Sequence, residues 1–271
     1  MNRRKFLQLL AYGAVTTSLV GEDLFATTTS DKIYYPLDSL STKLNLKGKK
    51  DLFLDKKYEK SFYSVCKKLK LVQRHVGYGN YNVISFDDVI NTARWSSNIG
   101  DFTSDELAFM EYIFYYNPEE HGFYGERTCQ SITHEINMKD IIKIPGTGHY
   151  LFQDRTLKTY EHMKNDIGET IVLTSGVRSV MKQMKLFLDK LDRSDLNLSK
   201  TAVSIAPPGF SYHTVGDFDI GKKGWGYDNF TARFALTEEF FEMRKLPYID
   251  MRYTVNNKDG VRYEPWHIKI V

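Results

Sequence analysis

The sequence has little cysteine, little net charge and no long apolar run, and each shortage limits what the protein can be. Two cysteines, Cys66 and Cys129, allow at most one disulfide, and two separate buried thiols are the alternative. A net charge of +3, scattered along the chain, is too small to indicate a nucleic-acid partner. Because no apolar stretch reaches the roughly 20 residues that span a bilayer, a permanent transmembrane helix is not expected.

What the chain does have is enough length and apolar content for a substantial core. Its 271 residues suit one large domain, or one domain with an extension, and 42% of them are hydrophobic. Aromatic residues reach 14%, as expected of a rigid extracytoplasmic protein or one with an aromatic-lined groove. Composition thus indicates a globular protein and gives no information about its binding partners.

The first 26 residues have the layout of a bacterial export signal. A basic start is followed by an apolar stretch from Phe6 to Val20. The run RRKFL, residues 3–7, is similar to the twin-arginine pattern R-R-x-F-L, which a receptor reads as an address. We therefore expect residues 1–26 to be a twin-arginine-like signal that directs the protein to the periplasm or cell surface.

The next two segments differ in periodicity. Residues 27–49 are polar and aperiodic, which indicates a linker. Residues 50–143 are predicted to form a mainly helical subdomain, because apolar residues three and four apart mark one helix near residue 58 and another after Ser104. The segment 81–86 between them is interpreted either as a strand or as the entry to a short helix that ends near Trp95.

Glycine and proline in 144–150 mark the predicted boundary of a second domain, residues 144–271. A helix ending at Gly168, a short strand at 171–176 and an amphipathic helix just after Arg178 are expected there. The segments 249–255 and 261–271 are predicted to pair as an antiparallel hairpin. The fold class is therefore α+β, with a small antiparallel sheet, flanking helices and an N-terminal helical subdomain.

One loop in the second domain combines a histidine with two carboxylates. His213 is followed by Asp217 and Asp219 in the run PPGFSYHTVGDFDIG. Along a straight strand, His213 and Asp219 would be roughly 20 Å apart, so both can bind one metal ion only if the chain bends at Gly216. Taken alone, an ordinary surface turn explains this segment at least as well.

A second candidate pair, Glu264 and His267, lies in the run YEPWHIKIV. Three residues along a strand turn two side chains to opposite faces, but Pro265 disturbs the strand and can bring both to one site. A glutamate near a metal-bound water is the standard general base of metal-assisted amide hydrolysis. This motif by itself is weak, because the last strand of a sheet also accounts for it.

Three runs occur in order along the chain: SGVRSVMKQ, SYHTVGDFDIG and YEPWHIKIV. Three ordered motifs are a more specific indication of function than any one of them. Together they resemble the zinc D-Ala-D-Ala carboxypeptidases of the VanY type, which belong to the wider lysostaphin, carboxypeptidase and hedgehog-like zinc fold. The resemblance covers residues 144–271 and does not extend to 50–130.

The resemblance implies roles for individual residues. His213, an aspartate after Gly216 and His267 would bind Zn²⁺, and Glu264 would be the general base. Arg178 would stabilise the developing oxyanion or bind a substrate carboxylate. Ser211 and Gln183 also match the family and are expected to contact substrate, although a structural role is at least as natural for Gln183. Apart from the resemblance, the aromatic Trp266 is expected to line a groove for the peptide, with a core position as the alternative.

The aspartate departs from the family pattern. That pattern is H-x-x-G-x-A-x-D, whereas here Asp219 comes one residue early. Because Asp219 precedes the aliphatic Ile220, we interpret the difference as a one-residue deletion after Gly216 and choose Asp219 as the ligand. Asp217 is the alternative.

The expected function is that of an exported zinc peptidase acting on the stem peptides of peptidoglycan, most simply by removing a terminal D-alanine. Two alternatives stay open. The same site could act as a D,D- or L,D-endopeptidase or as an L,D-carboxypeptidase. From a different class, the domain could be a catalytically silent zinc-bearing module that binds the cell wall.

Overall fold

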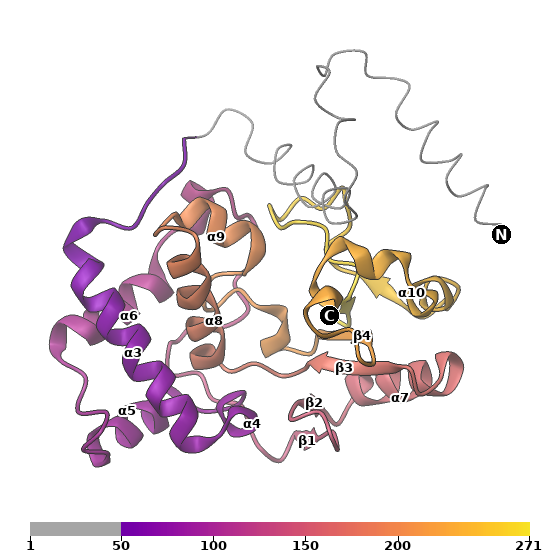
Figure 1. Ribbon diagram of the computed structural model, residues 1–271, viewed down its shortest axis with the longest axis horizontal. Coiled ribbons are helices and arrows are strands. Elements are labelled where there is room, and N and C mark those ends of the chain that lie inside the picture. Colours follow the sequence, from indigo (N-terminus) through magenta and orange to yellow (C-terminus); the bar gives the residue numbers. More distant parts are fainter. Residues whose placement is uncertain (1–49) are drawn as a thin grey trace. The chain divides into compact units, whose positions relative to one another are not determined.

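The computed structural model describes residues 50–271 (Figure 1), so the predicted signal, residues 1–26, and the predicted linker, residues 27–49, lie outside the described residues. Helices and small antiparallel sheets alternate along the chain, which confirms the α+β class. No helix in this part of the chain is long and apolar enough to cross a membrane. The α-helices are α3 (Glu59–Val76), α4 (Tyr78–Tyr81), α5 (Phe86–Trp95), α6 (Ser104–Tyr115), α7 (Arg155–Ile167), α8 (Val180–Arg193), α9 (Leu198–Ser204) and α10 (Glu238–Met243).

The helical part follows the predicted periodicity. On α3 the residues Phe62, Val65, Leu69 and Val72 are fully buried, since steps of three and four place them on one face. The region between the two predicted helices takes the helical alternative, because Ser85 caps α5 by accepting a hydrogen bond from the backbone N–H of Asp88 (3.0 Å). Both helix predictions are confirmed.

The start of α6 is fixed by a capping box. Thr103 Oγ1 accepts from the backbone N–H of Glu106 (3.3 Å), and Glu106 Oε2 accepts from the backbone N–H of Thr103 (2.8 Å). The same carboxylate, which is buried, also accepts from Lys68 Nζ (2.7 Å) and from the Ser64 hydroxyl. Burial raises the pKa of Glu106, but the hydrogen bonds from Lys68, Ser64 and Thr103 outweigh it and lower the pKa below its ordinary value of 4.5.

Replacing Glu106 by glutamine is expected to lower the free energy of unfolding by about 1–3 kcal/mol at neutral pH, because it weakens several bonds to a buried group. Since the folded-state pKa is lowered, this stabilisation is present above the unfolded pKa and is lost as the pH falls through the folded value. The difference in free energy of unfolding between Glu106→Gln and wild type should therefore shrink at acid pH. Glu111→Gln, on the exposed side of the same helix, is the control. A difference for Glu106→Gln that stays the same at acid and neutral pH would contradict this explanation.

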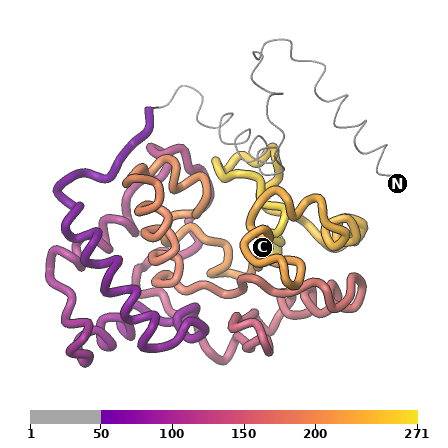
Figure 2. Tube along the Cα trace, viewed as in Figure 1, coloured from indigo at the N-terminus to yellow at the C-terminus, as the bar shows by residue number. Residues whose placement is uncertain are grey.

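Helix α8 joins the core of the N-terminal helices. Figure 2 shows this orange segment beside the indigo and magenta helices, and its residues Met184, Phe187 and Leu188 are buried in one apolar cluster with α3 and α6. The N-terminal helices thus pack on a helix that begins 36 residues beyond the predicted boundary at residue 144 (180 minus 144). Whether 50–143 and 144–271 are separate domains stays a prediction.

The predicted boundary segment itself is the turn of a small hairpin. Residues 144–149 connect β1 (Ile141–Lys143) to β2 (Tyr150–Phe152), which pair antiparallel. The carbonyl of Tyr150 accepts from the backbone N–H of Val177 (2.8 Å), which attaches this hairpin to the segment after β3. The glycine and proline signal therefore predicts the turn correctly.

A four-stranded antiparallel sheet carries the second half of the chain. Its order is β3 (Ile171–Ser175), β4 (Phe218–Lys222), β6 (His267–Lys269) and β5 (Asp250–Met251). Phe218, Ile220 and Ile268 are fully buried in an apolar cluster that also contains residues of α7 and α10. Because side chains alternate along a strand, Asp219 and His267 point to the opposite face of the sheet.

The predicted C-terminal hairpin is confirmed in its pairing and wrong in its length. Asp250 pairs with Lys269 and Met251 with Ile268, in antiparallel register. The residues from 252 to 266 contain no strand, because Pro265 has no N–H for a ladder and the backbone N–H of Glu264 bonds instead to the carbonyl of Tyr253 (2.9 Å). This irregular connection lines the site described next.

The two cysteines are free thiols. Cys66 on α3 is half-buried and Cys129 is buried. Burial raises the pKa of Cys66 to about 12 and that of Cys129 to about 11, so both are protonated at neutral pH. The arrangement therefore matches the separate thiols and not the disulfide.

Candidate metal centre and active site

His213 lies in a tight bend that precedes β4. Tyr212–Thr214 form the short 3-10 helix η4, and the backbone N–H groups of Gly216 and Asp217 both donate to the carbonyl of Tyr212 (3.1 Å each). Gly216 has a φ of 139°, a region that favours glycine. The bend that the sequence requires at Gly216 is therefore present, and it folds His213 back towards Asp219.

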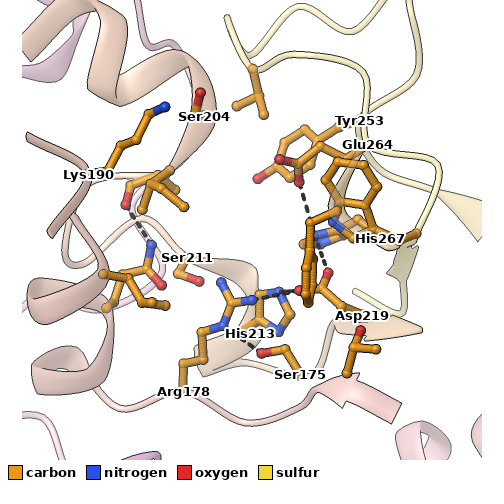
Figure 3. A pocket seen from close by; sticks show the side chains of 18 of the residues that line it. Ser175, Arg178, Lys190, Ser204, Ser211, His213, Asp219, Tyr253, Glu264 and His267 are labelled. Carbon is orange, nitrogen blue, oxygen red and sulfur yellow. Dashed lines mark hydrogen bonds and ion pairs between the residues drawn. The ribbon is translucent and has the colours of Figure 1, made fainter. Parts of the chain in front are cut away.

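Three side chains meet at the sheet face opposite the apolar cluster (Figure 3). Asp219 and His267 are direct partners on β4 and β6, so their side chains lie next to each other on one face. Asp219 Oδ1 is 3.2 Å from His267 Nδ1, and Asp219 Oδ2 is 3.3 Å from His213 Nε2. One possible ligand atom from each of these buried residues lies within 4.8 Å of the others.

His213 is held in one orientation by the backbone. Its Nδ1 lies 2.9 Å from the carbonyl oxygen of Gly176, which can only accept, so Nδ1 carries the hydrogen and Nε2 faces Asp219 unprotonated. Burial and the nearby Arg178 lower the pKa of His213 to about 4, although Asp219 opposes the shift. A neutral imidazole with a free Nε2 is the form that a metal ligand needs.

His267 is oriented the other way round. Its Nε2 lies 3.0 Å from Asp217 Oδ2, which leaves Nδ1 facing Asp219. Burial lowers the pKa of His267, but the adjacent carboxylates of Asp217 and Asp219 prevail and raise it to about 9. Because a ligating imidazole is neutral, a metal ion that binds at Nδ1 has to displace a proton.

Asp217 lies behind His267 and away from the cluster. Its carboxylate accepts from the Arg252 guanidinium and from the backbone N–H groups of Ile270 (2.8 Å) and Val271 (3.4 Å). Burial raises the pKa of Asp217, yet the bonds to His267 and Arg252 lower it to about 2. Of the two candidate aspartates, Asp219 thus lies with both histidines, whereas Asp217 contacts His267 on the side remote from Asp219.

The three clustered residues fit a metal ion. Nε2 of His213 and Oδ1 of Asp219 are buried without a hydrogen bond to any of the described residues, an expensive arrangement unless another group binds there. Two imidazole nitrogens and one carboxylate oxygen are a donor set that suits a divalent metal with one coordination position left for water or substrate. The chemistry of the site therefore favours a metal centre.

Glu264 reaches the cluster through a turn and not from a strand. The carbonyl of Glu264 accepts from the backbone N–H of His267 (3.2 Å), and Oε2 lies 3.7 Å from His267 Nδ1. The proline between them thus permits the shared site that a regular strand would forbid. Burial raises the pKa of Glu264 to about 7, against the opposing charges of Arg262 and His267.

Arg178 contacts the cluster from below in Figure 3. Its Nε donates to Ser175 Oγ (2.8 Å) and its Nη2 donates to Asp219 Oδ2 (2.6 Å). The ion pair holds Asp219 in place and, together with the effect of His213, lowers the pKa of that carboxyl well below its usual range despite burial. Arg178 therefore lies beside the predicted ligand and on the wall of the cavity.

A cavity of about 310 Å³ opens in front of the cluster, and the remaining predicted residues line it. Ser211 and Trp266 are buried side chains in this lining. Gln183 also lines the cavity, and its Nε2 donates to the carbonyl of Ala206 (2.6 Å), which supports a structural role. Apart from Asp217, the alternative ligand, all the residues proposed from sequence thus line one cavity.

Sequence reasoning missed two contributors to this site. Tyr253 is buried, lines the cavity and packs its ring 4.8 Å from the ring of His267. Arg252 anchors Asp217 from the end of β5. Neither residue belongs to a recognisable motif, and no local signal predicts that this irregular segment reaches the site.

The part of the chain that carries this cluster also matches a known family. Residues 151–271 match the family model described as VanY, D-alanyl-D-alanine carboxypeptidase. No curated protein matches the sequence significantly.

Several solved structures are similar to about half of the chain. A mutant of the vancomycin resistance D,D-pentapeptidase VanY, from a VanB-type resistance cassette and in complex with Zn(II), is 20% identical over 48% of this chain and 78% of its own, with a TM-score of 0.36. The LD-carboxypeptidase LdcB is 24% identical over 50% and 70%, with a TM-score of 0.41. The vancomycin resistance D,D-dipeptidase VanXYg, in complex with a D-Ala-D-Ala phosphinate analogue, is 22% identical over 51% and 58%, with a TM-score of 0.40.

The family match spans β2 to β6 and therefore every residue of the cluster, together with Glu264 and Arg178. It leaves the N-terminal helices α3 to α6 outside. Residues 151–271 thus match the VanY family of D-alanyl-D-alanine carboxypeptidases, and this match supports a metallopeptidase enzyme.

Proposed function

We propose that the protein is a zinc-dependent carboxypeptidase that removes the terminal D-alanine from peptidoglycan stem peptides. The observation that carries this proposal is the buried group of His213, Asp219 and His267, with Glu264 beside it, at the wall of a cavity in a VanY-family domain. The chemistry of two imidazoles and one carboxylate is that of a catalytic zinc site.

In this mechanism His213 Nε2, His267 Nδ1 and a carboxylate oxygen of Asp219 would hold the zinc ion. When bound, the ion would polarise the scissile carbonyl and make a nearby water more acidic. Gly176 and Asp217 fix the two imidazole rings through their other nitrogens, so the ligand atoms are aligned in advance. The chain therefore supplies a site that is already ordered.

Glu264 is the proposed general base and acid. With a pKa near 7, its carboxyl can accept a proton from the attacking water and return it to the leaving amine at neutral pH. Arg178 is the proposed electrostatic partner, because its guanidinium lies at the cavity wall next to Asp219 and can also face a substrate oxyanion or carboxylate. Ser211 and Trp266 would contact the peptide from the same wall.

The place of action follows from the substrate. Peptidoglycan lies outside the cytoplasmic membrane, so the proposal requires export, and residues 1–26 with their RRKFL run are the candidate signal. We therefore place the protein in the periplasm or at the cell surface.

A digest of defined muropeptides tests the activity. Purified protein with zinc should convert a stem pentapeptide to a tetrapeptide, detected by mass spectrometry as loss of one alanine. A chelator should abolish the conversion and added zinc should restore it, because the metal would be held by only three side chains. Cleavage of cross-linked muropeptides into single muropeptides would instead assign an endopeptidase. Loss of alanine from a tetrapeptide would assign an L,D-carboxypeptidase. Inactivity on every wall peptide with stoichiometric zinc would leave a silent wall-binding module.

A further inference from the structure

The charged residues that line the cavity are not balanced. Arg178 pairs with Asp219 (2.6 Å), and Arg262 Nε lies 3.6 Å from Glu264 Oε1. Among residues 50–271, these two pairs account for both carboxylates of the lining. Three further cationic side chains remain, and we call them the basic wall: Lys182, Lys190 and Arg193, all from α8.

The basic wall is a continuous strip on one face of α8. Steps of eight and three residues from Lys182 bring the three side chains within an arc of roughly 80° around the helix axis. From Lys182 to Arg193 the strip is about 16 Å long at 1.5 Å per residue. Figure 3 shows Lys190 across the cavity from Glu264 and His267. All three basic-wall residues line the same cavity as the cluster of His213, Asp219 and His267.

No acidic side chain among residues 50–271 forms an ion pair within 4 Å of any basic-wall residue. Asp189, a neighbouring carboxylate on the same helix, is instead paired with Lys185 (2.5 Å). Burial and neighbouring positive charges lower the pKa values of both lysines. For Lys182 the causes are burial, then Arg178 and Lys185, and the pKa falls to about 8. For Lys190 they are burial, then Arg262 and Arg193. An anion bound there would offset the cost of burying the two ammonium groups and would reduce the repulsion between the neighbouring positive charges.

We infer that the basic wall binds the free carboxylates of an extended anionic peptide, so that the preferred substrates are stem peptides whose acidic residues are not amidated. This inference rests on the proposed function and names its substrate class. A strip of about 16 Å matches four to five extended residues at about 3.3–3.6 Å each, which is the length of a stem peptide. Carboxylates spaced along such a peptide can each meet a cation of the strip.

Binding measured separately from cleavage tests the inference. The probes are L-Ala-γ-D-Glu-L-Lys-D-Ala-D-Ala and the same peptide with γ-D-isoglutamine, which replaces one carboxylate by a carboxamide. Titration calorimetry on the full chain with Glu264→Gln, in the presence of zinc, avoids turnover. The acidic peptide should bind about three- to fivefold more tightly, the range expected of one partly exposed ion pair. This preference should weaken as salt is raised.

Variants of the strip make the test specific. Lys182→Met and Lys190→Met should weaken binding of the acidic peptide and leave the affinity for the amidated peptide unchanged. Lys190→Arg should retain the preference for the acidic peptide. Lys70→Met, at an exposed position of α3 outside the cavity, is the matched control. Equal binding of both peptides, or an equal loss for both in the variants, would overturn the inference. A retained preference in a wild-type protein that cleaves no muropeptide would instead refute the proposed function and leave the basic wall standing.

Discussion

Glutamine in place of Glu264 is expected to lower kcat on stem pentapeptide by about 10²–10⁴-fold, the usual contribution of a general acid or base. The side chain keeps its shape and its place in the turn before β6, so zinc affinity and KM should change little. A carboxamide cannot accept and return the proton, because it does not titrate near neutral pH. The measurement is kcat and KM from released D-alanine, together with zinc content.

The control for this variant is Glu111→Gln, at an exposed position of α6 remote from the cavity lining. It removes the same charge and should leave kcat unchanged. If Glu264→Gln bound zinc normally and cleaved stem peptides at the wild-type rate, the assignment of Glu264 as the base would be wrong. Loss of zinc from the variant would point to a ligand role instead.

Asparagine in place of Asp217 is expected to weaken zinc binding by about 10–100-fold, although Asp217 lies outside the ligand cluster. Its carboxylate contacts His267 Nε2 and thereby leaves Nδ1 free to face Asp219. An asparagine amide can present its NH₂ group to Nε2 and favour the wrong tautomer. A competition titration with a chromophoric chelator would measure the affinity.

The same substitution should also destabilise the fold by about 3–5 kcal/mol, because it leaves the Arg252 guanidinium without its buried anionic partner. Chemical denaturation of the metal-free protein isolates this effect. Asp250→Asn, at an exposed position of neighbouring β5, removes a comparable charge and serves as the control for both measurements. Zinc affinity equal to wild type in a destabilised Asp217→Asn protein would show that Asp217 only supports the fold.

The elements that were predicted well share one property, a signal that is local in sequence. The face of α3 follows from steps of three and four, and the helix after Arg178 follows from the same rule. The turn at 144–149 follows from glycine and proline. By contrast, the predicted hairpin is too long, since β-branched and aromatic residues between 252 and 266 pack around the cavity without forming a ladder.

The candidate site was only partly accessible from sequence. His213 and Glu264 could be proposed because three motifs occur in the order that the family resemblance implies. The choice between Asp217 and Asp219 rested on an assumed deletion. In the structure, strand register places Asp219 opposite His267, and an intervening imidazole separates Asp217 from the cluster. Register depends on pairing between residues almost fifty positions apart, which no local pattern encodes.

By itself, the sequence determined the α+β class, the positions of the main helices and the residue types that a metallopeptidase needs, because periodicity and short motifs are properties of neighbouring residues. Only the tertiary structure decided which atoms face one another. It set the opposite orientations of the two imidazoles and placed Asp217 behind His267. It also left the three cations of α8 at the cavity wall without an acidic partner among residues 50–271. These features arise where the β4–β6 pairing and the packing of α8 bring distant segments together.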